Sequence, residues 1–121
     1  MNKVLNEWLG ENVMGWFIDS SNWTDYYADK KTNEFVMDCL NWNPTKDLNQ
    51  AMMCVITFAN NRQAIWVVRK LRNGKIYCTL SNTPKDGDAH KRYAAKRAEN
   101  FDELPKAICE AIKQAVEGKD E

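Results

Sequence analysis

The sequence predicts an α+β domain in which helices pack against one antiparallel three-stranded sheet. Two β-rich runs flank an Asn-Gly dipeptide in the middle of the chain, which is typical of a hairpin. Apolar residues repeat at helical spacing in three other segments. The length of 121 residues suits a single domain spanning 1–121. The expected order is helix, irregular segment, helix, three strands and a final helix.

Residues 2–13 are expected to form a short amphipathic helix. Its apolar stripe comprises Val4, Leu5, Trp8 and Leu9. Met14-Gly15-Trp16 ends this helix, because Gly15 can adopt the left-handed conformation of a helix stop.

Residues 16–44 form an irregular, aromatic-rich segment without a sustained period. Disordered chains contain few aromatic residues, so this segment is expected to fold against the domain, with a short strand near residues 34–40. Tryptophan and tyrosine anchor many protein interfaces. The candidate partner-binding residues are therefore Trp16, Trp23, Tyr26, Tyr27 and Trp42.

Asn43-Pro44-Thr45 signals the start of a second helix. Asn43 or Thr45 can cap it, and Pro44 suits the first helical position. Asp47 then lies in the electropositive first turn. The apolar stripe that follows comprises Leu48, Ala51, Met52, Val55 and Ala59, and Asn60-Asn61 closes the helix.

Two strands are expected over residues 64–71 and 75–81, joined by a two-residue turn at Asn73-Gly74. Arg72 then lies opposite Lys75, and this register divides the hairpin into two faces. The predicted core face carries Ile65, Val67, Leu71, Ile76, Cys78 and Leu80. The opposite face carries Trp66, Val68, Lys70, Arg72, Lys75, Tyr77 and Thr79.

The rest of the chain is expected to hold one further strand or helix and a final helix. Residues 82–90 are expected to form an exposed polar loop, and residues 91–98 fit either a third strand or a helix. The final helix spans about residues 102–117, with Pro105 in its first turn and Gly118 at its end. Residues 118–121 are expected to be a frayed tail.

The usual signatures of an enzyme or a metal site are missing from the sequence. The cysteines at 39, 54, 78 and 109 match no zinc spacing, and they are expected to be reduced and mostly buried. His90 is the single histidine and lies in the polar loop. No phosphate-binding glycine loop or nucleophile motif occurs. The protein is therefore expected to be no enzyme and to need no metal or cofactor, and no apolar run is long enough for a membrane span.

The formal net charge is zero, and this value excludes a uniformly basic polyanion-binding protein. The charges are nevertheless segregated along the chain. Residues 1–61 carry four basic and eight acidic residues, whereas residues 62–97 carry ten basic and two acidic ones. Aromatic side chains beside cations are typical of a single-strand or nucleotide platform. The candidate phosphate-binding residues are Trp66, Lys70, Arg72, Lys75, Tyr77, Lys91, Arg92, Lys96 and Arg97. The alternative is that the aromatic residues belong to the core and the charges pair internally.

Three segments together resemble the phage ABA sandwich domain family of small bacteriophage and prophage proteins. They are Leu5-Asn6-Glu7-Trp8 running into Val13-Met14-Gly15-Trp16, the run from Asn43-Pro44-Thr45 to Ala51-Met52-Met53, and the run from Leu104-Pro105 to Ala111-Ile112. The resemblance implies a phage origin, a location in the host cytoplasm and an α/β/α layered fold. It implies no activity, and each segment also has a structural role as a helix stop, a cap or a core stripe.

Two functions from different classes are expected. The first is a small non-enzymatic phage protein that inhibits a host protein by binding it, for example a component of antiviral defence such as a CRISPR effector. The second is a nucleic-acid or nucleotide binder that uses the basic segment of residues 62–97. Homodimerisation is left open, because sheet edges invite pairing.

Overall fold

The computed structural model describes residues 3–20, 23–82 and 92–118. Its elements are α1 (Lys3–Asn12), β1 (Trp16–Asp19), β2 (Tyr26–Asp29), β3 (Phe35–Asp38), the 3-10 helix η1 (Cys39–Asn41), α2 (Leu48–Arg62), β4 (Ala64–Lys70), β5 (Ile76–Asn82), β6 (Arg92–Ala98), the 3-10 helix η2 (Phe101–Glu103) and α3 (Leu104–Glu117). The predicted loop after residue 82, His90, Lys91 and the tail after Gly118 lie outside the described residues, as do the side chains of Asn82, Arg92 and Tyr93.

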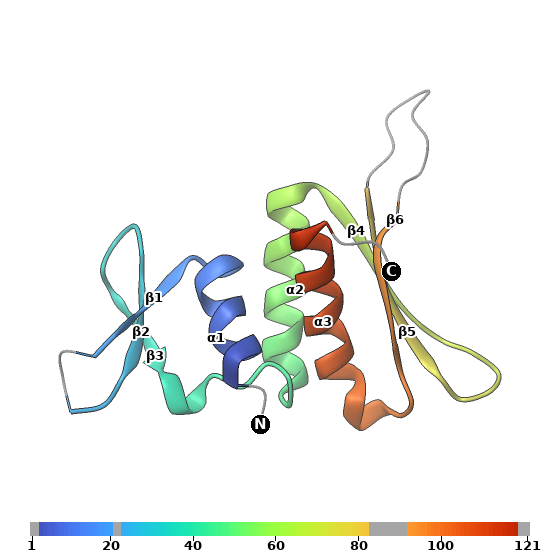
Figure 1. Ribbon diagram of the computed structural model, residues 1–121, viewed down its shortest axis with the longest axis horizontal. Helices are drawn as coiled ribbons and strands as arrows, with labels where there is room; N and C mark the ends of the chain where they lie inside the picture. The colour runs from blue at the N-terminus through green and yellow to red at the C-terminus, as the bar shows by residue number, and fades with distance from the viewer. Residues whose placement is uncertain (1–2, 21–22, 83–91, 119–121) are drawn as a thin grey trace.

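The predicted α+β class is confirmed, with helices packed on antiparallel three-stranded sheets. One sheet has the order β1-β2-β3 and the other the order β4-β5-β6. Figure 1 shows the helices in the middle of the molecule and one sheet at each end of its long axis. An α/β/α sandwich has its sheet in the middle, whereas here α2 and α3 cover only one face of β4–β6.

Three of the four residues in the predicted stripe of helix α1 pack on the core, since Leu9 is buried and Leu5 and Trp8 are partly buried. Leu9, Gly10 and the polar Asn6 are buried, and Val13 continues the same side just after the helix. Val4 is 78% exposed, so its assignment to the core stripe is wrong. Asn6 fits the buried face because both the nitrogen and the oxygen of its side-chain amide make a hydrogen bond, which an apolar pattern cannot show.

The aromatic segment of residues 16–44 is less irregular than predicted, because it contains β1, β2, β3 and η1. Only β3, within residues 34–40, matches the predicted strand. Each of these strands has four residues, which is too short for a clear alternation in the sequence. The Asp29 side chain accepts hydrogen bonds from the N–H groups of Lys31 (2.8 Å) and Thr32 (3.2 Å), which shapes the turn between β2 and β3.

The cap of α2 also differs from the prediction. Asp47 is the N-cap, and its carboxylate accepts a hydrogen bond from the N–H of Gln50 at 3.1 Å. Asn43 and Thr45 instead bond to Asn6 of α1. The helix continues past Asn60-Asn61 to Arg62, and Gln63 ends it in the left-handed conformation with φ 53°.

The predicted hairpin exists, but its register is shifted by one residue. The turn has three residues, 72–74, with the N–H of Leu71 donating to the carbonyl of Lys75 at 2.9 Å and Gly74 at φ +85°. Asn-Gly suits this turn as well as the two-residue one, because both place glycine in the left-handed region. The register therefore pairs Arg69 with Tyr77 and moves every β4 side chain to the other face.

The core lies where α2 and α3 meet the sheet β4–β6. Trp66 and Val68 of β4 pack on this core with Cys78 and Leu80 of β5, so the prediction that Ile65 and Val67 face it is wrong. Residues 92–98 form a strand, which settles the alternative left by the sequence. The predicted stripe of α3 is confirmed, as are Pro105 in its first turn and Gly118 at its C-cap with φ +68°.

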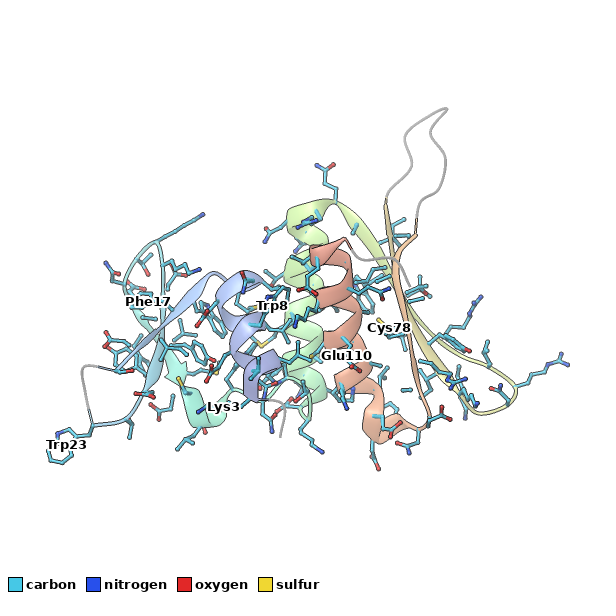
Figure 2. The ribbon with its side chains drawn as sticks, in the orientation of Figure 1. Lys3, Trp8, Phe17, Trp23, Cys78 and Glu110 are labelled. Carbon is cyan, nitrogen blue, oxygen red and sulfur yellow. The ribbon has the colours of Figure 1, made fainter. Side chains whose placement is uncertain are left out.

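Three of the four cysteines are completely buried in this core, as predicted. Cys54 of α2, Cys78 of β5 and Cys109 of α3 are free thiols with no exposed surface, and Figure 2 shows Cys78 between the sheet and α3. Burial raises the pKa of Cys54 to about 12 and that of Cys78 to about 11, because a thiolate is poorly solvated there. These thiols therefore serve as small apolar packing groups.

Replacing Gly10 with alanine tests the contact between α1 and the first sheet. A Cβ at residue 10 would lie 2.9 Å from the ring of Tyr27, which is itself 1% exposed. Alanine normally stabilises a helix by about 1 kcal/mol relative to glycine. We expect Gly10→Ala instead to lower the free energy of unfolding by about 1–2 kcal/mol, measured by urea denaturation. Glu11→Ala, at an exposed neighbour, is the control, and an equal or higher stability of Gly10→Ala would contradict this packing.

Candidate functional site

The five aromatic residues predicted to bind a partner divide into core and surface. Trp16, Tyr27 and Trp42 are 6%, 1% and 3% exposed, so their assignment to a partner surface is wrong. Their rings contact one another with centroids 4.8 to 6.3 Å apart and form a small aromatic core under α1. Tyr26 is half-buried, and Trp23 is completely exposed. Figure 2 shows Trp23 pointing away from the molecule at the end of its long axis.

The outer face of β1–β3 carries an aromatic surface of which the sequence analysis identified only Tyr26. Phe17 of β1 lies opposite Ala28 of β2, which lies opposite Phe35 of β3. The rings of Phe35 and Tyr26 are 5.4 Å apart, and the Tyr26 hydroxyl donates to the Asp19 carboxylate at 2.9 Å. We call Phe17, Tyr26 and Phe35 the aromatic face. The signal that could have found it is the alternation around the buried Trp16 and Tyr27, which places their neighbours on the opposite side.

A pocket of about 570 Å³ opens at the same end of the molecule, between α1 and the segment that joins β3 to α2. Its apolar and aromatic walls include Ile18, Tyr27, Leu40 and Trp42. The remaining lining residues are polar or charged: Lys3, Asn6, Glu7, Thr24, Asp25, Asp38, Cys39 and Asn43. Three carboxylates and one ammonium thus surround it, and we call it the acidic pocket.

The negative charge of the acidic pocket is reflected in two of its lining groups. Burial raises the pKa of the half-buried Cys39 thiol above its usual value, and the carboxylates of Asp25 and Glu7 raise it further. Burial also raises the pKa of the Tyr27 hydroxyl, with smaller contributions from Cys39 and Glu7. Both groups are therefore protonated at neutral pH, which makes Cys39 a weak nucleophile.

Asn6 holds the inner wall of this pocket in place. Its amide donates to the Asn43 side chain at 3.0 Å and accepts from the N–H of Thr45 at 3.3 Å. Its backbone carbonyl accepts a bond of 2.7 Å from Nε1 of Trp42. On the other side of α1, the ammonium of Lys113 in α3 lies 5.8 Å from the Trp8 ring centroid. The first two of the three segments that carry the family resemblance therefore contact each other as parts of the scaffold.

The predicted phosphate-binding residues do not form one platform. The prediction that Trp66 and Tyr77 share a face is wrong, because the shifted register turns Trp66 toward the core and Tyr77 outward. Tyr77 lies between Arg69 of β4 and Arg97 of β6 in a single cross-strand row. We call this row the basic face. It lies beside the exposed apolar side chains of Ile65 and Val67, which are 41% and 46% exposed.

The other predicted cations are spread around the sheet. Lys70 of β4 and Lys96 of β6 lie on the same face of the sheet as Trp66, whereas Arg72 lies in the hairpin turn. Lys75 and Arg97 form ion pairs with Glu99 at 3.7 and 3.0 Å, so internal pairing neutralises part of the charge. Each of these pairs is solvent-exposed and stabilises the fold by at most about 1 kcal/mol.

The described residues contain neither a metal-binding cluster nor a helix that could span a membrane. No group of three or more histidine, cysteine or carboxylate side chains in residues 3–20, 23–82 and 92–118 could hold a metal ion. Over the same residues, no helix combines the length and the apolar character that crossing a bilayer requires.

Comparisons of the chain with protein-family models, with curated proteins and with solved structures found no match. The resemblance to the phage ABA sandwich domain family therefore stays a prediction from the sequence.

Selective alkylation of Cys39 tests the arrangement of the thiols. Because the other three cysteines have no exposed surface, iodoacetamide should modify only Cys39 in the folded protein and all four after unfolding, as measured by mass spectrometry. Alkylation requires the thiolate, and burial and neighbouring carboxylates raise the pKa of Cys39 above its usual value, so the rate should still be rising with pH between pH 8 and 9. A rate that levels off below pH 8, or modification of Cys109, would contradict the structure.

Proposed function

We propose that this chain is a small, non-enzymatic, phage-encoded accessory protein that acts by binding a protein partner. Its partner would be a host protein in the cytoplasm, such as a component of antiviral defence, which the binding inhibits. The observation that carries the proposal is the set of large apolar side chains exposed at the end of the molecule formed by β1–β3. Trp23 is fully exposed, Leu40 is 90% exposed and Phe35 is 62% exposed.

Such side chains are the usual anchors of protein interfaces. A buried aromatic or aliphatic side chain at the centre of an interface contributes much more than the polar groups around it. Exposed apolar side chains that gather at one place indicate an interaction site, whereas single ones do not. Phe35 belongs to the aromatic face, and Leu40 borders the acidic pocket on the neighbouring segment. Leu40 thus lies among the carboxylates of the acidic pocket, and the Tyr26 ring beside Phe35 is hydrogen-bonded to Asp19. Negative charge beside these two apolar side chains favours a partner with a basic surface.

The non-enzymatic and phage-related parts of the proposal have separate supports. The protonated state of Cys39 and the absence of nucleophile or metal-binding motifs in the sequence favour binding over catalysis. The phage origin, the inhibitory role and the cytoplasmic location are supported by the resemblance of residues 5–16, 43–53 and 104–112 to the phage family.

Replacing Phe35 tests the binding surface. We expect Phe35→Glu to remain folded by circular dichroism, because the side chain is mostly exposed. We also expect it to lower partner affinity at least about tenfold and therefore to reduce the protection that the protein gives a phage. This protection is measured in a host that carries its defence systems. Phe101→Glu, at an equally exposed phenylalanine of η2, is the matched control and should keep full protection. Equal protection by both variants, or equal loss, would refute this surface as the interface.

A nucleic-acid-binding function is the second candidate, and the basic face favours it. A tyrosine flanked by two arginines on an open sheet face can stack on a base while the guanidinium groups contact phosphates. In this case the exposed Ile65 and Val67 widen the platform on β4.

Binding to a single-stranded oligonucleotide at several salt concentrations tests this candidate. We expect the affinity to fall steeply with salt, and Arg69→Gln to lower the slope by about one unit. Lys46→Gln, an exposed cation before α2, should leave the slope unchanged. If the wild-type protein shows no retention on single-stranded DNA at low ionic strength, this second function is excluded.

A further inference from the structure

We infer that the acidic pocket is a binding site for an organic cation, a guanidinium or ammonium group carried on an alkyl chain. The inference does not depend on the proposed protein partner, because it concerns the pocket alone and a free small cation can test it.

The walls and the rim of the pocket suit different parts of such a ligand. Apolar side chains, with Ile18 and Leu40 among them, can cover an alkyl stem. The carboxylates come from three separate parts of the chain. Glu7 belongs to α1, Asp25 directly precedes β2 and Asp38 ends β3. A cationic head bound among them would face negative charge from several directions.

The pocket suits an organic cation better than a metal ion. Within the part of the chain that the structure describes, no three acidic, cysteine or histidine groups lie close enough to coordinate a metal ion. A guanidinium group is larger, spreads its charge over a plane and donates hydrogen bonds in several directions. It can therefore contact carboxylates that come from different parts of the chain.

The one cation that already lines the pocket does not neutralise it. The ammonium of Lys3 is 3.9 Å from the Glu7 carboxylate, and the Lys3 side chain is 81% exposed. An exposed ion pair at this distance is weak, so a ligand can displace it. The charge balance of the lining residues is then three carboxylates against one exposed ammonium.

The pKa directions of two groups in the pocket wall agree with this charge balance. Carboxylates that line the pocket raise the pKa of the Cys39 thiol, and Glu7 also contributes to the raised pKa of the Tyr27 hydroxyl. Since the potential that disfavours a thiolate also favours a bound cation, the two observations agree with the geometry.

Titration of the protein with agmatine, monitored by NMR chemical shifts, tests the inference. We expect saturable binding that moves signals of Leu40 and Ile18, and about threefold weaker binding in both Glu7→Gln and Asp38→Asn. Lys3→Gln should bind more tightly, because the competing ammonium is removed. Glu34→Gln removes an exposed carboxylate of the same sheet end that does not line the pocket, and it should bind like the wild type.

A second ligand distinguishes the source of the cation. An arginine-containing peptide that binds at least tenfold more tightly than agmatine, and loses this advantage when arginine is replaced by citrulline, identifies the ligand as a basic side chain of a partner. Equal affinities for agmatine, spermidine and the peptide identify a free cation. No saturable binding of any of the three at millimolar concentration, or equal weakening by Glu34→Gln, would overturn the inference. Neither result bears on the Phe35→Glu test of the proposed function.

Cys39 supplies a readout that does not need a ligand. Methanethiosulfonate reagents with an ammonium or a sulfonate head should modify Cys39 at different rates, because the pocket attracts the first and repels the second. Each reagent's rate with Cys39 is divided by its rate with a free thiol, and we expect this ratio to be at least about fivefold higher for the cationic reagent. The double substitution of Glu7→Gln and Asp38→Asn should remove this preference. Equal relative rates in the wild type would overturn the inference.

Discussion

Asn6 lies on the buried side of α1 and makes hydrogen bonds that join this helix to residues 42–45. The rest of the N-terminal half depends on this network, because it positions Trp42 beside Trp16 and Tyr27. A buried amide that lost its partners would cost about 1–3 kcal/mol for each unpaired group. The contact is therefore specific: another register of α1 against the Asn43-Pro44-Thr45 segment would leave buried polar groups unsatisfied.

The fold turns the charge segregation of the sequence into a separation in space. The acidic half of the chain forms β1–β3 and the acidic pocket, whereas the basic segment forms β4–β6 at the opposite end of the long axis (Figure 1). The three helices between the two sheets keep these surfaces apart. A chain with zero net charge therefore presents two surfaces of opposite character, each with exposed apolar side chains, and this arrangement suits a protein that acts by binding.

The two ends differ in how they expose those side chains. In the sheet β4–β6, the helices cover the face that carries Trp66 and Val68, and the face that carries Arg69, Tyr77 and Arg97 stays open. In the first sheet, α1 covers the face that carries Trp16 and Tyr27, and the aromatic face stays open. In both cases a sheet is covered on one side only, so its outer face is available to a ligand or partner.

The elements whose signals are local could be predicted from the amino-acid sequence. These are the left-handed conformations of Gly15 and Gly118, the periodic stripe of α3, the presence of a hairpin around Asn73-Gly74 and the burial of Cys54, Cys78 and Cys109, because they depend on backbone conformation or on repeated apolar spacing. The hairpin register, the strands of residues 16–38 and the division of their aromatic residues into core and surface became clear only from the folded molecule. Those choices depend on which face a helix covers, and on contacts such as that of Asn6 with Asn43 across 37 residues, which no local pattern contains.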